Sequence, residues 1–131
     1  MNDINLMNKA ADNIRILAAS MVEKAKSGHP GGAMGGADFV NVLFSEFLVY
    51  DPKNPTWEGR DRYFQDPGHM SPMLYSVLAL TGKFTIDELK EFRQWGSVTP
   101  GHPEVNVMRG IENTSGPLGQ GHTYAVGDSI A

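Results

Sequence analysis

The feature that most constrains this chain is a glycine-rich stretch, Asn113 to Gly121, which reads Asn-Thr-Ser-Gly-Pro-Leu-Gly-Gln-Gly. Its three glycines, Gly116, Gly119 and Gly121, allow positive φ and a close approach of the backbone to a ligand, and Pro117 stiffens the turn. Tyr124 to Ala131 is compatible with a helix whose first N–H groups and positive dipole end face the turn. The stretch therefore predicts a seat for an anion such as a phosphate or, alternatively, an ordinary glycine turn that caps a helix.

All four histidines of this 131-residue chain directly follow a glycine, although glycine accounts for only 15 residues. They are His29, His69, His102 and His122. A glycine before a functional side chain lets a ligand approach closely, and imidazole exchanges protons near neutral pH and hydrogen-bonds to hydroxyl groups. We therefore expect one site assembled from four loops. A histidine-held metal is the weaker alternative, because no two of these histidines have the close helical spacing of common zinc motifs.

The composition restricts the class of protein. With 40% hydrophobic and 20% charged residues, the chain is predicted to be one water-soluble globular domain. A net charge of −4 without a basic stripe argues against a nucleic-acid partner. The lack of cysteine excludes disulfides and thiolate chemistry and favours a cytoplasmic protein. Charged residues interrupt the first apolar segment, and no apolar run reaches membrane-spanning length, so neither a signal peptide nor a membrane partner is expected.

Two helices are predicted in the first half of the chain. Asp3 to Lys26 has apolar residues at three- and four-residue steps and indicates one amphipathic helix. Asn2 or Asp3 can cap its start, and Gly28 can take the left-handed position that ends it. A second helical pattern runs from Met34 to Val49.

Two shorter helices are predicted in the second half. One begins at Ser71 as the capping residue and stops at Gly82. The other runs from Thr85 to Trp95, where Thr85 and Glu88 have the spacing of a capping box. After Gly96 the periodicity is lost until about Gly121, and a loop of that length in a small domain is usually functional or disordered.

Arg60 to Gln65 is the best strand candidate, and it leads directly into Asp66-Pro67-Gly68-His69. Open α/β sheets place ligands in such loops, at the carboxyl ends of parallel strands. The predicted fold class is therefore α/β, a helix-rich portion of a domain with a parallel sheet. Since parallel strands need neighbours and only one is evident, the chain is expected to be incomplete.

Four segments, in this order, resemble the amino-terminal part of transketolases, which use thiamine diphosphate to move two-carbon ketol units between sugars. The segments are Ser27-Gly28-His29-Pro30-Gly31, Asp66-Pro67-Gly68-His69, Thr99-Pro100-Gly101-His102-Pro103-Glu104 and Gly116-Pro117-Leu118-Gly119-Gln120-Gly121. The third and fourth favour transketolase over the related deoxyxylulose-phosphate synthase, although the second has some of the character of the synthase. The resemblance implies that residues 1–131 are part of a thiamine-diphosphate-binding domain, acting on ketose and aldose phosphates in the pentose phosphate pathway.

The resemblance also implies roles for individual residues. His29 and His102 are expected to bind the sugar, and His69 to lie beside the cofactor and the donor, so that all three serve the catalysis. Gly116, Pro117 and Leu118, with His69, are expected to contact the cofactor.

The resemblance further implies Mg²⁺, with all of its protein ligands beyond residue 131 and none in this chain, and a homodimer in the full-length form. The isolated chain is expected to be inactive without the remaining transketolase chain or a partner subunit. The alternative is a non-catalytic interaction module that packs against a partner through exposed apolar helix faces. Three residues depart from the family pattern: Pro67, where asparagine is usual, His122 and Asp128.

Overall fold

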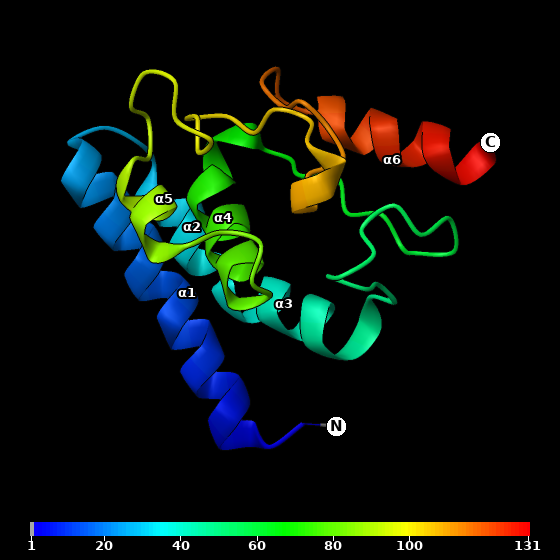
Figure 1. Ribbon diagram of the computed structural model, residues 1–131, viewed down its shortest axis with the longest axis horizontal. Helices are drawn as coiled ribbons and strands as arrows, with labels where there is room; N and C mark the ends of the chain where they lie inside the picture. Colours follow the sequence, from blue (N-terminus) through cyan, green and yellow to red (C-terminus); the bar gives the residue numbers. More distant parts are fainter. Residues whose placement is uncertain (1) are drawn as a thin grey trace.

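The regular structure of this protein, in a computed structural model that describes residues 2–131, consists of helices (Figure 1). In chain order they are α1 (Ile4–Ala25), α2 (Pro30–Gly35), α3 (Ala37–Val42), the π-helix η1 (Leu43–Phe47), the 3₁₀ turn η2 (Gly68–Met70), α4 (Ser71–Leu80), α5 (Ile86–Lys90), the 3₁₀ turn η3 (Val107–Arg109) and α6 (Gln120–Ile130). Within the described residues there is no β-strand, only an isolated antiparallel bridge between Asn106 and Ile111. None of the helices in this part of the chain is both long and apolar enough to cross a membrane.

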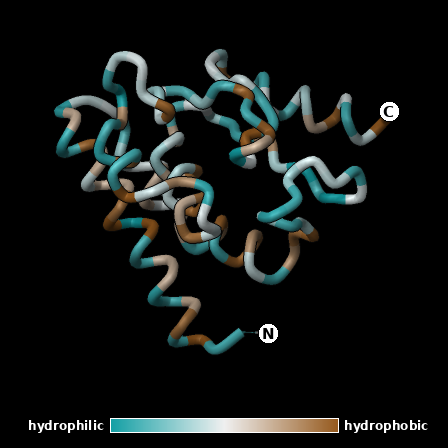
Figure 2. Tube along the Cα trace, in the orientation of Figure 1, coloured by the Kyte–Doolittle hydropathy of each residue, from teal (hydrophilic) through white to brown (hydrophobic). Residues whose placement is uncertain are grey.

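The long first helix is confirmed, together with its cap. Oδ1 of Asp3 accepts hydrogen bonds from the backbone N–H groups of Asn5 and Leu6, both at 3.0 Å, and so satisfies two free donors of the first turn. The buried residues of α1 follow three- and four-residue steps: Ala11, Ile14, Ala18 and Met21. Figure 2 shows the resulting alternation of hydrophobic and hydrophilic residues along this helix.

The predicted end of α1 at Lys26 is within one residue of the observed end at Ala25, but the predicted left-handed cap is wrong by two residues. Lys26, not Gly28, takes the left-handed cap, with φ of 51°, and its N–H donates to the carbonyl of Glu23. The helix is therefore capped two residues before Gly28, which lies in the following loop with φ of 134°.

The predicted helix from Met34 to Val49 is divided into three pieces. The helical region begins earlier, at Pro30, whose fixed φ suits a first helical turn. Gly35 and Gly36, at the end of α2, separate α2 from α3. The last turn, η1, has the wider π geometry. The prediction failed because glycine weakens a helix locally without disturbing the apolar periodicity around it.

The central helix is α4, which lies against α1, α2 and α3 (Figure 1). Its residues from Ser71 to Leu78 are all buried, and Tyr75 packs between Phe84 and Phe92. Ser71 is not the cap as predicted but the first residue of the helix, because its hydroxyl donates instead to the carbonyl of Gly101, at 2.7 Å. A helix buried on all sides gives one firm support from which loops can extend.

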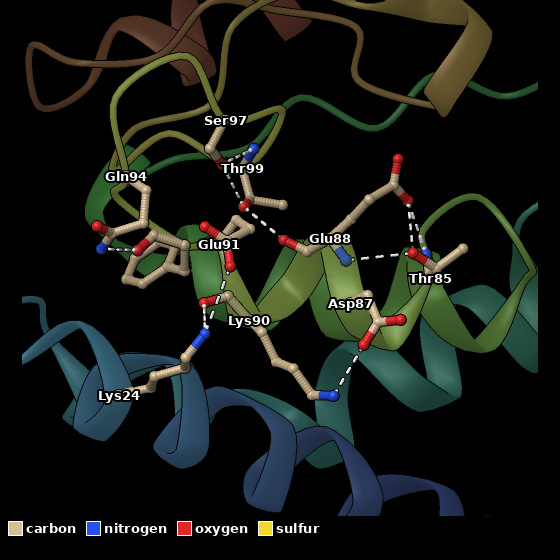
Figure 3. A network of polar contacts seen from close by, with 10 residues as sticks. Lys24, Thr85, Asp87, Glu88, Lys90, Glu91, Gln94, Ser97 and Thr99 are labelled. Atoms are coloured by element: carbon tan, nitrogen blue, oxygen red, sulfur yellow. Dashed lines mark hydrogen bonds and ion pairs between the residues drawn. The ribbon is translucent and has the colours of Figure 1, made fainter.

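The capping box of α5 is confirmed: Thr85 Oγ1 accepts from the N–H of Glu88, and the Glu88 carboxylate accepts from the N–H of Thr85. The helix ends at Lys90, before the predicted Trp95, because the chain turns left-handed at Arg93. Figure 3 shows how side chains fasten α5 on both sides. Lys24 of α1 donates to the carbonyl of Lys90, and Thr99 donates to the carbonyl of Glu88.

The predicted strand from Arg60 to Gln65 is not formed among residues 2–131. The segment has a bend at Arg60 and no regular secondary structure from residue 61 to 65, and no strand pairs with it among residues 2–131. A strand requires a neighbour that satisfies its backbone groups. Side chains hold the segment instead. Arg60 forms an ion pair with Glu112, and the N–H of Gln65 donates to the side chain of Asn113.

Glu88 makes the stability of this region depend on pH. Its hydrogen bond with Arg109, followed by the N–H of Thr85, lowers its pKa from 4.5 to about 2. Since the folded pKa lies below the unfolded one, the contact stabilises the fold above about pH 4.5, and this stability is lost as the pH falls toward 2. The free energy of unfolding, measured with urea, should therefore fall less between pH 7 and pH 3 in Glu88→Gln than in the unaltered chain. The matched control is Glu91→Gln, which removes an exposed carboxylate next to the same helix. Its decrease in the free energy of unfolding between pH 7 and pH 3 should be nearly that of the unaltered chain.

Candidate functional site

Three of the four glycine–histidine loops meet. His29 is the residue before α2, at the end of the loop that follows α1, and His69 lies in η2, immediately before the buried helix α4. The centroids of their rings are 4.7 Å apart, with the planes tilted by 40°. Two imidazoles that come from loops 40 residues apart in the sequence therefore face one common space.

His102 joins this pair from the third loop. A Cβ built on Gly68 would lie 3.1 Å from Cδ2 of His102 and 2.9 Å from Cβ of Ser115. The loops of His69 and His102 and the glycine-rich stretch from Asn113 to Gly121 therefore touch at a position that only glycine fits. Partial burial lowers the pKa of His102, and the positive charges of Arg93, His69 and His29 lower it further. At neutral pH His102 is thus biased toward the uncharged form, which accepts a proton or a hydrogen bond.

Buried polar groups fix the loop that carries His69. Ser115 donates from its hydroxyl to the carbonyl of Gln65 at 2.5 Å, and Asn113 both accepts from the N–H of Gln65 at 3.0 Å and donates to its carbonyl at 3.3 Å. The side chain of Gln65 donates to the carbonyl of Pro67 at 3.1 Å. Sequence reasoning missed this network. Its only local signal is a pair of polar residues, Asn113 and Ser115, at the start of the glycine-rich stretch.

The glycine-rich stretch ends in a helix, as predicted, but the helix begins at Gln120 rather than Tyr124. Of its three glycines only Gly119 has positive φ, 89°. The N–H groups of Gly121 and His122, in the first turn of α6, have no acceptor within the helix, and Gly121 itself is buried against Asp66 and Gln65. Leu118, on the turn before them, is 73% exposed. A Cβ built on Gly68 would lie 2.9 Å from Cβ of Ser115, so the start of this stretch lies against the loop that carries His69.

His122 does not join the other histidines in any contact found within residues 2–131. Its Nδ1 lies 2.9 Å from Oδ2 of Asp66, whose side chain is only 4% exposed. The contact lacks hydrogen-bonding geometry, so both carboxylate oxygens of Asp66 are buried without a donor from the described residues.

Two further contacts place α6 against the segment from Arg60 to Gln65. Asp128 pairs with Arg62 at 2.5 Å, and Tyr124 stacks on Phe64 with ring centroids 6.5 Å apart. The charge of Asp128, one of the residues that depart from the family pattern, is therefore compensated by Arg62. The sequence does carry a signal for these two contacts, because Arg62, Phe64 and Asp66 alternate and would share one face of the predicted strand.

No group of three or more histidine, aspartate or glutamate side chains is placed to hold a metal ion in the part of the chain that the structure describes. The three site histidines instead line an open surface. Beside His102, an open cleft of about 860 Å³ is lined by Ser27, Arg93, Trp95 and Glu104, among others. This geometry suits binding and orientation of a polar, hydroxyl-bearing molecule, with proton exchange at the imidazoles.

Residues 6–131 match the family described as "Transketolase, thiamine diphosphate binding domain". The transketolase of Buchnera aphidicola subsp. Baizongia pistaciae is 54% identical over 127 residues, which are 96% of this chain and 19% of that protein. Transketolase 1 of Escherichia coli K12 is 53% identical over 122 residues, 92% of this chain and 18% of that protein.

Solved structures agree in fold. The transketolase from Leishmania mexicana superimposes with a TM-score of 0.90 at 48% identity, covering 95% of this chain and 19% of that one. A transketolase from Pichia stipitis in complex with sedoheptulose 7-phosphate has a TM-score of 0.90 at 44% identity, covering 95% of this chain and 18% of that one. The chain thus spans about a fifth of the length of these relatives.

Proposed function

This chain belongs to the family of transketolase thiamine diphosphate binding domains, and from that premise we propose that it works in a longer protein that transfers two-carbon ketol units from ketose to aldose phosphates. The observation that carries the proposal is the meeting of His29, His69 and His102, with Gly68 packed closely against Ser115 of the glycine-rich stretch. The match favours transketolase over deoxyxylulose-phosphate synthase.

In this proposal His29 and His102 bind and orient the sugar hydroxyl groups, and His69 lies between the sugar and the cofactor. Gly116, Pro117 and Leu118 contact the cofactor rings, and the first N–H groups of α6 face its diphosphate. When bound, thiamine diphosphate supplies the nucleophilic carbon that carries the two-carbon unit. The chain's own part is to hold the sugar in register and to accept or return protons at the imidazole nitrogens.

Other parts of the proposal rest on the same family membership. Mg²⁺ would be held by residues outside this chain, and Arg60 to Gln65 would become a strand of a parallel sheet beside strands that residues 1–131 do not supply. A homodimer is supported by exposed apolar side chains on α3 and η1, Phe39 at 66% and Phe47 at 70%. A cytoplasmic location is supported by the lack of cysteine.

The decisive experiment compares histidine variants of the longer protein in a ketol-transfer assay with thiamine diphosphate and Mg²⁺. His29→Ala, His69→Ala and His102→Ala should each lower kcat/KM by about a hundredfold or more. The matched control is His122→Gln, which alters the one glycine–histidine motif outside the cluster and keeps its backbone N–H; its effect should be far smaller. An equal loss in all four variants, or no transfer by the unaltered protein, would contradict the proposed function.

A further inference from the structure

Arg93 combines an unfavourable backbone with an unusual side-chain environment. Its φ of 62° lies in the left-handed region, where glycine is the residue of low cost. Its Nε is buried and has no hydrogen-bond acceptor among residues 2–131. A large charged side chain kept in such a conformation indicates a function for that side chain at that place.

The guanidinium of Arg93 lies between two of the histidine loops. On one side, Nη1 donates to Oγ of Ser27 at 3.0 Å, and Ser27 opens the motif that contains His29. On the other side, a Cβ built on Gly101 would lie only 2.8 Å from Nε, so the backbone just before His102 rests directly on the guanidinium. One side chain therefore touches both loops.

Both ends of Arg93 are fixed. Its N–H donates to the carbonyl of Thr99 at 3.0 Å, and Thr99 is itself buried and tied to α5 (Figure 3). Its guanidinium carbon lies 5.6 Å from the centre of the Phe92 ring, a side chain that is 1% exposed. The positive charge consequently stays close to His102 and does not swing into solvent.

From these contacts we propose that Arg93 is a positioning residue that sets the two loops of His29 and His102 against each other and holds its positive charge beside His102, an inference that rests on the proposed ketol transfer. The charged or titratable groups around His102 are Arg93, His69 and His29, with Glu104 in the same cleft. The charge of Arg93 is one of the causes that lower the pKa of His102. An uncharged imidazole can accept a proton from a sugar hydroxyl, which an imidazolium cannot do.

The direct test is an NMR titration of His102 in the protein that contains this chain, with its signal assigned by the loss seen in His102→Gln. Arg93→Gln removes the charge and should shift the titration of His102 to higher pH. Arg93→Lys keeps the charge and should leave it close to that of the unaltered protein. The matched control is Lys26→Gln, because Lys26 also has a left-handed backbone, with φ of 51°, beside Ser27, but pairs with Glu23. Lys26→Gln should not shift His102.

A second readout separates positioning from simple stability. In the ketol-transfer assay, the acid limb of kcat/KM should move to higher pH in Arg93→Gln and return in Arg93→Lys. Arg93→Gly, which removes the backbone cost, should remain folded and still show the shift. The inference is overturned if His102 titrates unchanged in Arg93→Gln, or if Lys26→Gln shifts it equally. Lack of transfer by the unaltered protein would instead reject the proposed function, and the NMR result would still decide whether Arg93 controls His102.

Discussion

Replacing Arg60 with alanine is expected to lower the free energy of unfolding by about 3–5 kcal/mol. Arg60 and Glu112 form a bidentate ion pair, with Nε donating to Oε1 at 2.8 Å and Nη2 donating to Oε2 at 3.0 Å. Each side chain is only 10% exposed. Without Arg60, the carboxylate of Glu112 would remain buried and uncompensated, and that desolvation cost is larger than the net value of the pair.

Urea unfolding at neutral pH tests this expectation, and Glu112→Ala should give a comparable loss. The matched control is Lys90→Ala, which breaks the exposed pair with Asp87, where the side chains are 55% and 89% exposed, and should lower the stability far less than Arg60→Ala does. The double variant Arg60→Met with Glu112→Leu removes both charges together and should recover most of the loss. If Arg60→Ala costs no more than Lys90→Ala, the pair does not hold the segment from Arg60 to Gln65 in place.

Local signals in the sequence were enough for part of the fold. The cap at Asp3, the periodicity of α1 and the capping box of Thr85 and Glu88 depend on residues within one or two turns, and all three are confirmed. The glycine before each histidine likewise indicated close approach of loops, and His29, His69 and His102 do meet.

The remaining features depend on contacts between distant residues. Ser71 does not cap α4 because its hydroxyl finds Gly101, and α5 stops early because the chain turns at Arg93 to reach Thr99. Neither partner is visible in the local pattern. In the segment from Arg60 to Gln65 the local signal is present, because its composition favours a strand. No strand forms there, since a strand requires a neighbouring strand that residues 2–131 do not provide.

The residues of the candidate site divide in the same way. The histidines were found because their motifs are local, whereas Arg93 lies in an unremarkable sequence between Phe92 and Gln94. Its importance follows only from a left-handed backbone and from the two loops that its side chain joins. A residue that acts by joining distant loops leaves no periodic or motif signal in a single sequence.

Replacing Gly121 with alanine is expected to detach α6 from the site. A Cβ on Gly121 would lie 2.6 Å from Cβ of Asp66 and 2.8 Å from the carbonyl oxygen of Gln65, and that oxygen is held by Asn113 and Ser115. The neighbours cannot move, so the helix must. Gly121 is the one residue of α6 that is buried, and an isolated helix of 11 residues is marginal in water, so a displaced α6 should fray.

Amide hydrogen exchange of α6 measures this directly, and Gly127→Ala is the matched control in the same helix. A Cβ on Gly127 meets nothing within 4 Å, and alanine is favoured over glycine inside a helix by about 0.5–1 kcal/mol, so this variant should slow exchange. Gly121→Ala should accelerate it and abolish the stacking contact between Phe64 and Tyr124. The same two variants also test whether the first turn of α6 binds the cofactor diphosphate. In the longer protein, the affinity for thiamine diphosphate should fall in Gly121→Ala and remain unchanged in Gly127→Ala. Equal affinities in the two variants, with α6 displaced in only one, would place the diphosphate away from the first turn of this helix.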